Sequence, residues 1–140
     1  MQRITTVTRY LLGLTFLVFA ANYFVPFLPA QPPPPADAMT FVVAFAGTGM
    51  MTFIKVIELI AAVALLTDRA SPLALALLAP IVVGIAFFHV ALAPAGIPIA
   101  IAVVALEVIT AWGYRSAFAP MLSWKRATVP AWSDARQSSV

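Results

Sequence analysis

The chain consists almost entirely of long apolar stretches, with little between them except proline, glycine and a few charged residues. A helix that crosses a bilayer needs about 20 mostly apolar residues, and such stretches cover about residues 9–28, 50–67, 72–92 and 97–114. Only 9% of the residues are charged, against roughly 25% in soluble domains. Because the connections are short, neighbouring helices are expected to run antiparallel. The sequence therefore predicts an all-α membrane protein, with one antiparallel four-helix transmembrane domain over residues 1–122.

Proline and glycine set the limits of the predicted spans. Four consecutive prolines, Pro32 to Pro35, follow the first stretch, and such a run cannot stay helical because proline lacks the N–H donor. An extended loop is expected there. The apolar stretch over residues 38–67 is too long for one crossing and is interrupted by Gly47 and Gly49. This pattern predicts a short interfacial helix at about residues 39–46 before the second span.

A cleavable signal peptide is the competing interpretation of the first stretch. Arg3 and Arg9 form a basic start, and Val18-Phe19-Ala20 resembles a cleavage site with a small residue. The apolar run continues beyond this site to Leu28, where a cleaved signal would turn polar. The length of the run favours a retained transmembrane helix.

The basic residues predict the orientation of the helices. Arg3 and Arg9 precede the first span, Arg69 lies between the second and third, and Arg115 follows the fourth, whereas the other two connections hold no lysine or arginine. The positive-inside rule then places both termini in the cytoplasm, as in a multi-pass protein of a bacterial inner membrane, with residues 123–140 as a polar cytoplasmic tail. The scattered charges form no basic stripe, so no nucleic-acid partner is expected.

A few ionisable side chains inside the spans are the candidates for function. They are Lys55 and Glu58 in the second span, His89 in the third and Glu107 in the fourth, joined by the polar Asn22 in the first. A charge at the centre of a membrane helix costs about 2.5–3.5 kcal/mol, so these groups are expected to face the bundle interior. At about 1.5 Å per residue, all but Glu107 lie in the outer third of the bilayer, and Glu107 lies near the midplane. We expect one polar cluster that opens towards the external side.

Several kinds of site are excluded by residue counts. The chain has no cysteine and a single histidine, so thiol chemistry, iron–sulfur ligation and a bis-histidine haem are absent, and no metal site is predicted. A purely structural interpretation stays open for each polar residue. Lys55 and Glu58 would form an intrahelical pair, His89 would bond to a neighbouring carbonyl, and Glu107 would hold packed helices together as a protonated group among apolar side chains.

Five segments together resemble the DoxX-like family of small membrane proteins, over about residues 9–122. They are Arg9-Tyr10-Leu11-Leu12-Gly13 with Asn22, Ile54-Lys55-Val56-Ile57-Glu58, Ala79-Pro80-Ile81-Val82-Val83, Phe88-His89, and Glu107 with Ala111-Trp112-Gly113-Tyr114-Arg115. The resemblance implies a four-helix inner-membrane protein and, in some relatives, association with quinone-linked oxidoreductases. Other relatives resemble accessory or chaperone subunits.

Three functions follow as hypotheses. The first is a membrane subunit, linked to an oxidoreductase partner, that binds a lipophilic ligand such as a quinone and carries no covalent cofactor. The second is a non-catalytic assembly subunit, and the third is an acid–base enzyme acting on a hydrophobic substrate. We assign proton-exchange roles to Glu58, His89 and Glu107, and ligand-binding roles to Asn22, Lys55 and His89. The sequence leaves the oligomeric state open.

Overall fold

Four long apolar helices form the body of the molecule, as predicted. The computed structural model describes residues 2–29 and 32–121. Its long helices are α1 (Gln2–Phe24), α3 (Met50–Thr67), α4 (Ser71–Ala91) and α5 (Ile97–Gly113). Shorter elements are α2 (Ala36–Gly47), the 3-10 turn η1 (Pro94–Gly96) and α6 (Arg115–Phe118). Each long segment is sufficiently long and apolar to cross a bilayer, with η1 extending the last one. The chain is therefore a multi-pass membrane protein.

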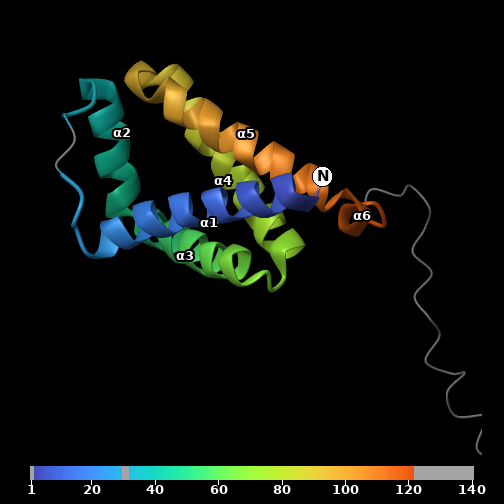
Figure 1. Cartoon of the computed structure of the whole chain (residues 1–140). Coiled ribbons are helices and arrows are strands. Elements are labelled where there is room, and N and C mark those ends of the chain that lie inside the picture. Colours follow the sequence, from blue (N-terminus) through green and yellow to red (C-terminus); the bar gives the residue numbers. More distant parts are fainter. Residues whose placement is uncertain (1, 30–31, 122–140) are drawn as a thin grey trace, which may run out of the picture.

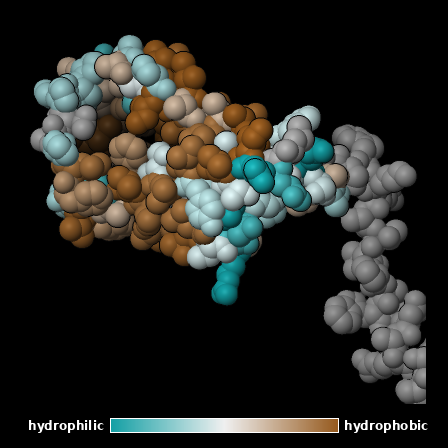
Figure 2. Space-filling model, viewed as in Figure 1, coloured by the Kyte–Doolittle hydropathy of each residue, from teal (hydrophilic) through white to brown (hydrophobic). Residues whose placement is uncertain are grey.

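The long helices pack in a closed ring (Figure 1). Along this ring α1 contacts α3, α3 contacts α4, α4 contacts α5, and α5 returns to α1. The central core contains Leu12 and Phe16 from α1, Leu65 from α3, Leu78 from α4 and Val103 from α5. Many large hydrophobic side chains are also exposed on the outer surface, and Figure 2 shows a broad brown area on one face. An apolar core inside an apolar surface is the arrangement expected of a bundle whose solvent is lipid.

The predicted span limits agree closely with three helices and differ for the first. The second span matches α3 at both ends, whereas α1 already begins at Gln2 and ends at Phe24 rather than at Leu28. Pro26 explains the early end, because proline disfavours helical geometry in the residue before it. The predicted tail, residues 123–140, lies outside the described residues.

Helix α2 confirms the short helix predicted before the second span. It stands across one end of the bundle, close to the start of α3 (Figure 1). Pro35, just before it, has φ −50° and ψ 152°, which is the extended geometry expected of the proline run. The turn into α3 places Gly49 at φ 77°, a left-handed conformation that glycine adopts without steric cost. We call this end of the bundle the α2 end.

The opposite end is held together by a polar cluster that the sequence analysis did not anticipate. Asp68, in the α3–α4 turn, accepts hydrogen bonds from Tyr114 at 2.6 Å and from Ser71 at 2.9 Å. The buried Arg9 of α1 lies 3.5 Å from the same Asp68 oxygen and donates to the Leu65 carbonyl of α3. The Tyr114 and Ser71 hydrogen bonds hold the pKa of Asp68 below its ordinary value. These residues, the Asp68 cluster, connect all four long helices.

The two ends of the described chain lie at the Asp68 end. Thr8 of α1 and Thr110 of α5 are joined by a 2.9 Å hydrogen bond between their hydroxyls, so the start of α1 lies beside the end of α5 (Figure 1). An even number of crossings requires this arrangement. The side of the membrane that this end faces stays the prediction made from the basic residues.

Candidate functional site

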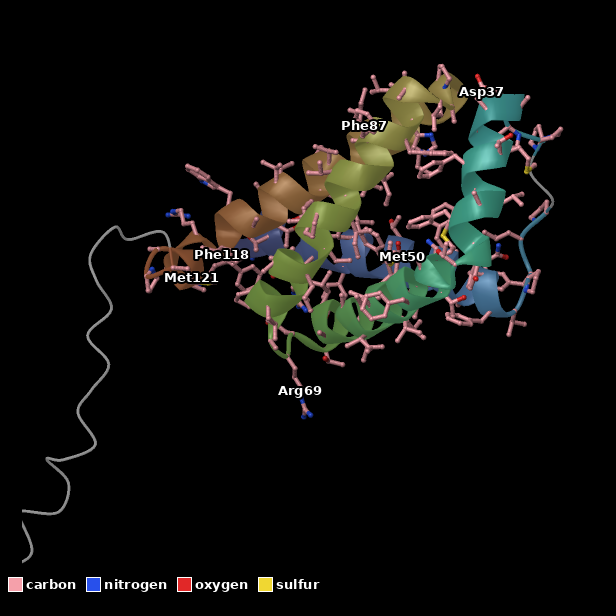
Figure 3. All side chains as sticks on the ribbon, turned by 180° about the vertical axis from the view of Figure 1, so that it is seen from behind. Asp37, Met50, Arg69, Phe87, Phe118 and Met121 are labelled. Atoms are coloured by element: carbon pink, nitrogen blue, oxygen red, sulfur yellow. The ribbon has the colours of Figure 1, made fainter. Side chains whose placement is uncertain are left out.

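A cavity of about 400 Å³ lies between α2, α3 and α4. Figure 3 shows the molecule from the side on which these helices frame it. Helix α2 contributes Phe41, Val42 and Phe45; α3 contributes Met51, Ile54, Lys55 and Glu58; and α4 contributes Pro80, Ile81, Gly84, Ile85, Phe88 and His89. The walls are apolar except at Lys55, Glu58 and His89. This volume is in the range of small-molecule sites.

The sequence of α4 explains why its side of the cavity is open. Gly84 has no side chain, and a β-carbon added there would meet no atom within 4 Å. Pro80, one turn earlier, lies inside the helix and removes one backbone hydrogen bond, which favours a bend. The two residues share one helical face, so this face of α4 leaves space opposite α2.

Lys55 and Glu58 form an ion pair at the wall contributed by α3. The Lys55 ammonium lies 2.7 Å from Glu58 Oε2, and the side chains are 19% and 2% exposed, respectively. Their spacing of three residues places them on one helical face. Because isolated charges are costly in hydrocarbon, each stabilises the other. The lysine has three N–H donors, so one partner leaves hydrogens for a further acceptor.

His89 occupies the end of α4 beside the short η1 turn. Its Nδ1 lies 3.2 Å from the carbonyl oxygen of Ala93, and its ring packs so closely on Gly96 that an added β-carbon would lie 2.1 Å from two ring atoms. A carbonyl can only accept, so this contact favours a proton on Nδ1 and makes Nε2 an acceptor in the neutral ring. The cavity therefore combines the Lys55 ammonium, a hydrogen-bond donor, with the His89 imidazole.

Aromatic side chains form the wall nearest α2. The rings of Phe41 and Phe45 stack with centroids 5.6 Å apart and an interplanar angle of 12°. The Phe41 ring also lies 5.8 Å from that of Phe88 on α4. Aromatic faces at these separations favour contact with another flat ring. A planar, lipophilic molecule suits this wall.

Asn22 does not line this cavity. Its side-chain oxygen accepts hydrogen bonds from the backbone N–H groups of Phe27 and Leu28, at 2.9 and 2.8 Å. The residue therefore holds the loop that follows α1 and satisfies backbone groups near the helix end. The nearby prolines, Pro26 and Pro29, are the sequence signal that a helix end lies here.

Glu107 also lies outside the cavity, in a separate groove between α4 and α5. The expected single cluster is thus divided: Lys55, Glu58 and His89 share one cavity, while Asn22 and Glu107 lie elsewhere. These residues lie at similar depths along their helices. The rotation of each helix about its own axis decides which of their side chains face the same cavity. In residues 2–29 and 32–121, no group of three or more histidine or acidic side chains could hold a metal ion.

Comparisons with protein-family models, with curated proteins and with solved structures find no match to this chain. The resemblance to DoxX-like proteins therefore stays a prediction. The four long apolar helices identify the chain as a multi-pass membrane protein.

Proposed function

We propose that the protein binds a lipophilic, quinone-like ligand in the cavity between α2, α3 and α4. The observation that carries the proposal is the meeting of the Lys55–Glu58 ion pair and His89 in one otherwise apolar cavity. Charged and basic groups are costly within a membrane and mark ligand or proton sites when they gather there. The open face of α4 at Gly84 leaves room for a ring.

The polar groups of the cavity match both redox forms of such a ligand. A quinone oxygen accepts a hydrogen bond, which the Lys55 ammonium is able to donate. A hydroquinone hydroxyl donates one, which His89 Nε2 is able to accept when Nδ1 carries the proton. Reduction of a quinone takes two electrons and two protons. In this proposal a partner oxidoreductase supplies the electrons, and His89 and Glu58 transfer the protons.

The resemblance to DoxX-like proteins supports the choice of a quinone and of an oxidoreductase partner. The chain itself contributes no thiol, so a partner or its cofactor has to carry the electrons. The same proposal places the Asp68 end in the cytoplasm and the cavity towards the external side of a bacterial inner membrane. This orientation is the one that the distribution of arginine predicts.

Binding of a short-chain benzoquinone to the purified protein in lipid nanodiscs tests the proposal. Replacing His89 by alanine removes one hydrogen-bonding group and is expected to weaken binding about tenfold. Gly84→Leu is expected to abolish binding because the new side chain fills the cavity and leaves its polar groups in place. Gly47→Leu is the matched control, since Gly47 also has free space around it but does not line the cavity.

Two results would count against a ligand site. Unchanged quinone binding in both His89→Ala and Gly84→Leu would exclude this cavity. If Glu58→Gln instead lowered the abundance of a membrane partner, with quinone binding intact, the assembly role would replace the proposal. Glu107→Gln serves as a charge control, because that residue lies in the other groove, and it should bind the quinone as the unaltered protein does.

A further inference from the structure

The groove between α4 and α5 contains a buried carboxyl group that the proposed quinone site does not use. Its volume is about 490 Å³, and Glu107 is the ionisable residue among those that line it. The walls are formed mainly by Val82, Val83, Ala86 and Phe87 of α4 and by Val104 and Val108 of α5. The groove is therefore an apolar depression with one carboxyl group among its lining residues.

The Glu107 carboxyl lacks a partner within the described part of the chain. The residue is 6% exposed, and its buried Oε2 atom has no hydrogen-bond partner among residues 2–29 and 32–121. Thr110 follows three residues later on the same helical face, and its hydroxyl is 2.9 Å from the Thr8 hydroxyl and 2.7 Å from the Leu106 carbonyl. The hydroxyl hydrogen of Thr110 is thus directed away from Glu107. Buried oxygens without a donor are rare in native structures, because each costs free energy.

The groove opens towards lipid rather than towards water. Val83, Phe87 and Val108, on its two walls, are strongly exposed, and Figure 3 shows Phe87 pointing away from the bundle. A molecule that enters here therefore comes from the hydrocarbon phase. Its chemistry must complement a carboxyl group, which keeps an acceptor oxygen in both protonation states, so a ligand with a hydrogen-bond donor suits it.

We propose that this groove is a second binding site, for a lipophilic amphiphile that carries one hydroxyl or amino group. The donor group bonds to Glu107, and the hydrocarbon part lies against the valine side chains. Oε2 is covered in the described structure, so a rotation about the Glu107 side-chain bonds presents it to the groove. The volume suits a small molecule. A transmembrane helix of a partner would need a longer apolar surface and is an alternative that the test separates.

Dicyclohexylcarbodiimide, a lipophilic carboxyl reagent, is the probe for this site. A carboxyl proton moves to one carbodiimide nitrogen while the carboxylate oxygen bonds to the central carbon; the adduct rearranges to an N-acylurea, and no atom is lost. The full chain is reconstituted in phosphatidylcholine vesicles, and labelled peptides are identified by mass spectrometry. We expect labelling at Glu107 that is absent from Glu107→Gln and unchanged in Glu58→Gln.

Protection experiments identify the ligand chemistry. Dodecanol is expected to slow the labelling of Glu107 about tenfold, the effect of one hydrogen bond to a carboxyl group, whereas dodecane has no effect. Ala86→Leu, which fills the groove, is expected to prevent labelling, and Ala91→Leu, on the same helix but outside the groove, is its matched control.

Three outcomes would overturn the proposal. The first is no labelling of Glu107 in vesicles. The second is equal protection by dodecane, which would show that the carboxyl group selects nothing. The third is a protein chain that copurifies with the unaltered protein and is lost in Glu107→Gln, without protection by dodecanol; the groove would then bind a helix. Because Glu58→Gln leaves this site unchanged, failure here is distinguishable from failure of the quinone site.

Discussion

The hydroxyl of Tyr114 donates a 2.6 Å hydrogen bond to Asp68 and so ties the end of α5 to the turn between α3 and α4. Asp68 also accepts a hydrogen bond from the Ser71 hydroxyl and lies beside Arg9. One carboxylate therefore connects segments that are far apart in the sequence. The donors stabilise the charged form of this carboxylate. Its protonation therefore affects the whole Asp68 end.

Acid is expected to weaken the fold through Asp68. The Tyr114 hydrogen bond, followed by that from Ser71, lowers the pKa of Asp68 from its ordinary value of 3.8. A carboxyl group with a lowered folded pKa stabilises the fold above its unfolded pKa, and this contribution disappears as the pH falls through the folded value. The midpoint of thermal unfolding in mild detergent, followed from neutral pH to below 3.8, measures the effect.

Asp68→Asn isolates this contribution from those of the other carboxyl groups. It should cost about 1 kcal/mol at neutral pH, a modest amount because the Asp68 side chain is 55% exposed. Below the folded pKa the variant and the unaltered protein should unfold at the same temperature. A difference between them that does not change with pH would contradict the assignment.

Replacing Arg9 is expected to loosen the contact between α1 and α3. Arg9→Met keeps the volume but removes the donor to the Leu65 carbonyl and the charge beside Asp68. Hydrogen bonds from charged groups contribute roughly 1.5–3 kcal/mol each, so a loss of about 2 kcal/mol in the free energy of unfolding is expected. Denaturant titration in mild detergent measures it.

Arg69→Met is the control for Arg9→Met. Arg69 is exposed and points away from the bundle (Figure 3), so its replacement should change stability by less than about 0.5 kcal/mol. Equal effects of the two substitutions would mean that Arg9 acts only through the net charge of this end.

The Lys55–Glu58 pair is expected to behave as a unit in stability measurements. Lys55→Met leaves Glu58, which is 2% exposed, without its counter-charge, and breaking a buried pair costs about 3–5 kcal/mol. The double change Lys55→Met and Glu58→Met should recover most of this loss, because two apolar side chains need no partner. Unfolding of the two single variants and the double variant in detergent gives the coupling energy.

The double variant also separates fold from function. This variant should be stable, but its proposed quinone site should no longer bind the benzoquinone. Restored stability together with restored binding would show that the pair is structural only.

Gly96→Ala is expected to displace His89 without removing its imidazole. The new β-carbon would lie 2.1 Å from the His89 Cε1 and Nδ1 atoms, so the ring has to leave the Ala93 carbonyl. We expect quinone binding to fall about as far as in His89→Ala, with a destabilisation of roughly 1–3 kcal/mol from the crowding. Gly47→Ala, where the added carbon meets nothing within 4 Å, should leave binding unchanged.

The sequence alone determined the four long helices with the short helix before the second span, their approximate limits and the class of protein. Insertion of a segment into lipid depends on its own composition and length, and proline or glycine ends a helix through local backbone geometry. These are properties of neighbouring residues, so α3 could be predicted at both ends and α2 could be placed between the proline run and Gly49. The early end of α1 was missed, although Pro26 was a local signal for it.

Only the tertiary structure decided which polar residues meet. Depth in the membrane follows from counting residues, but the rotation of each helix about its axis depends on how side chains of different helices pack together. This packing directs Lys55, Glu58 and His89 into one cavity and Glu107 into the groove between α4 and α5. It also brings Arg9, Asp68 and Tyr114 together, because closing the ring of helices joins segments that no local pattern relates.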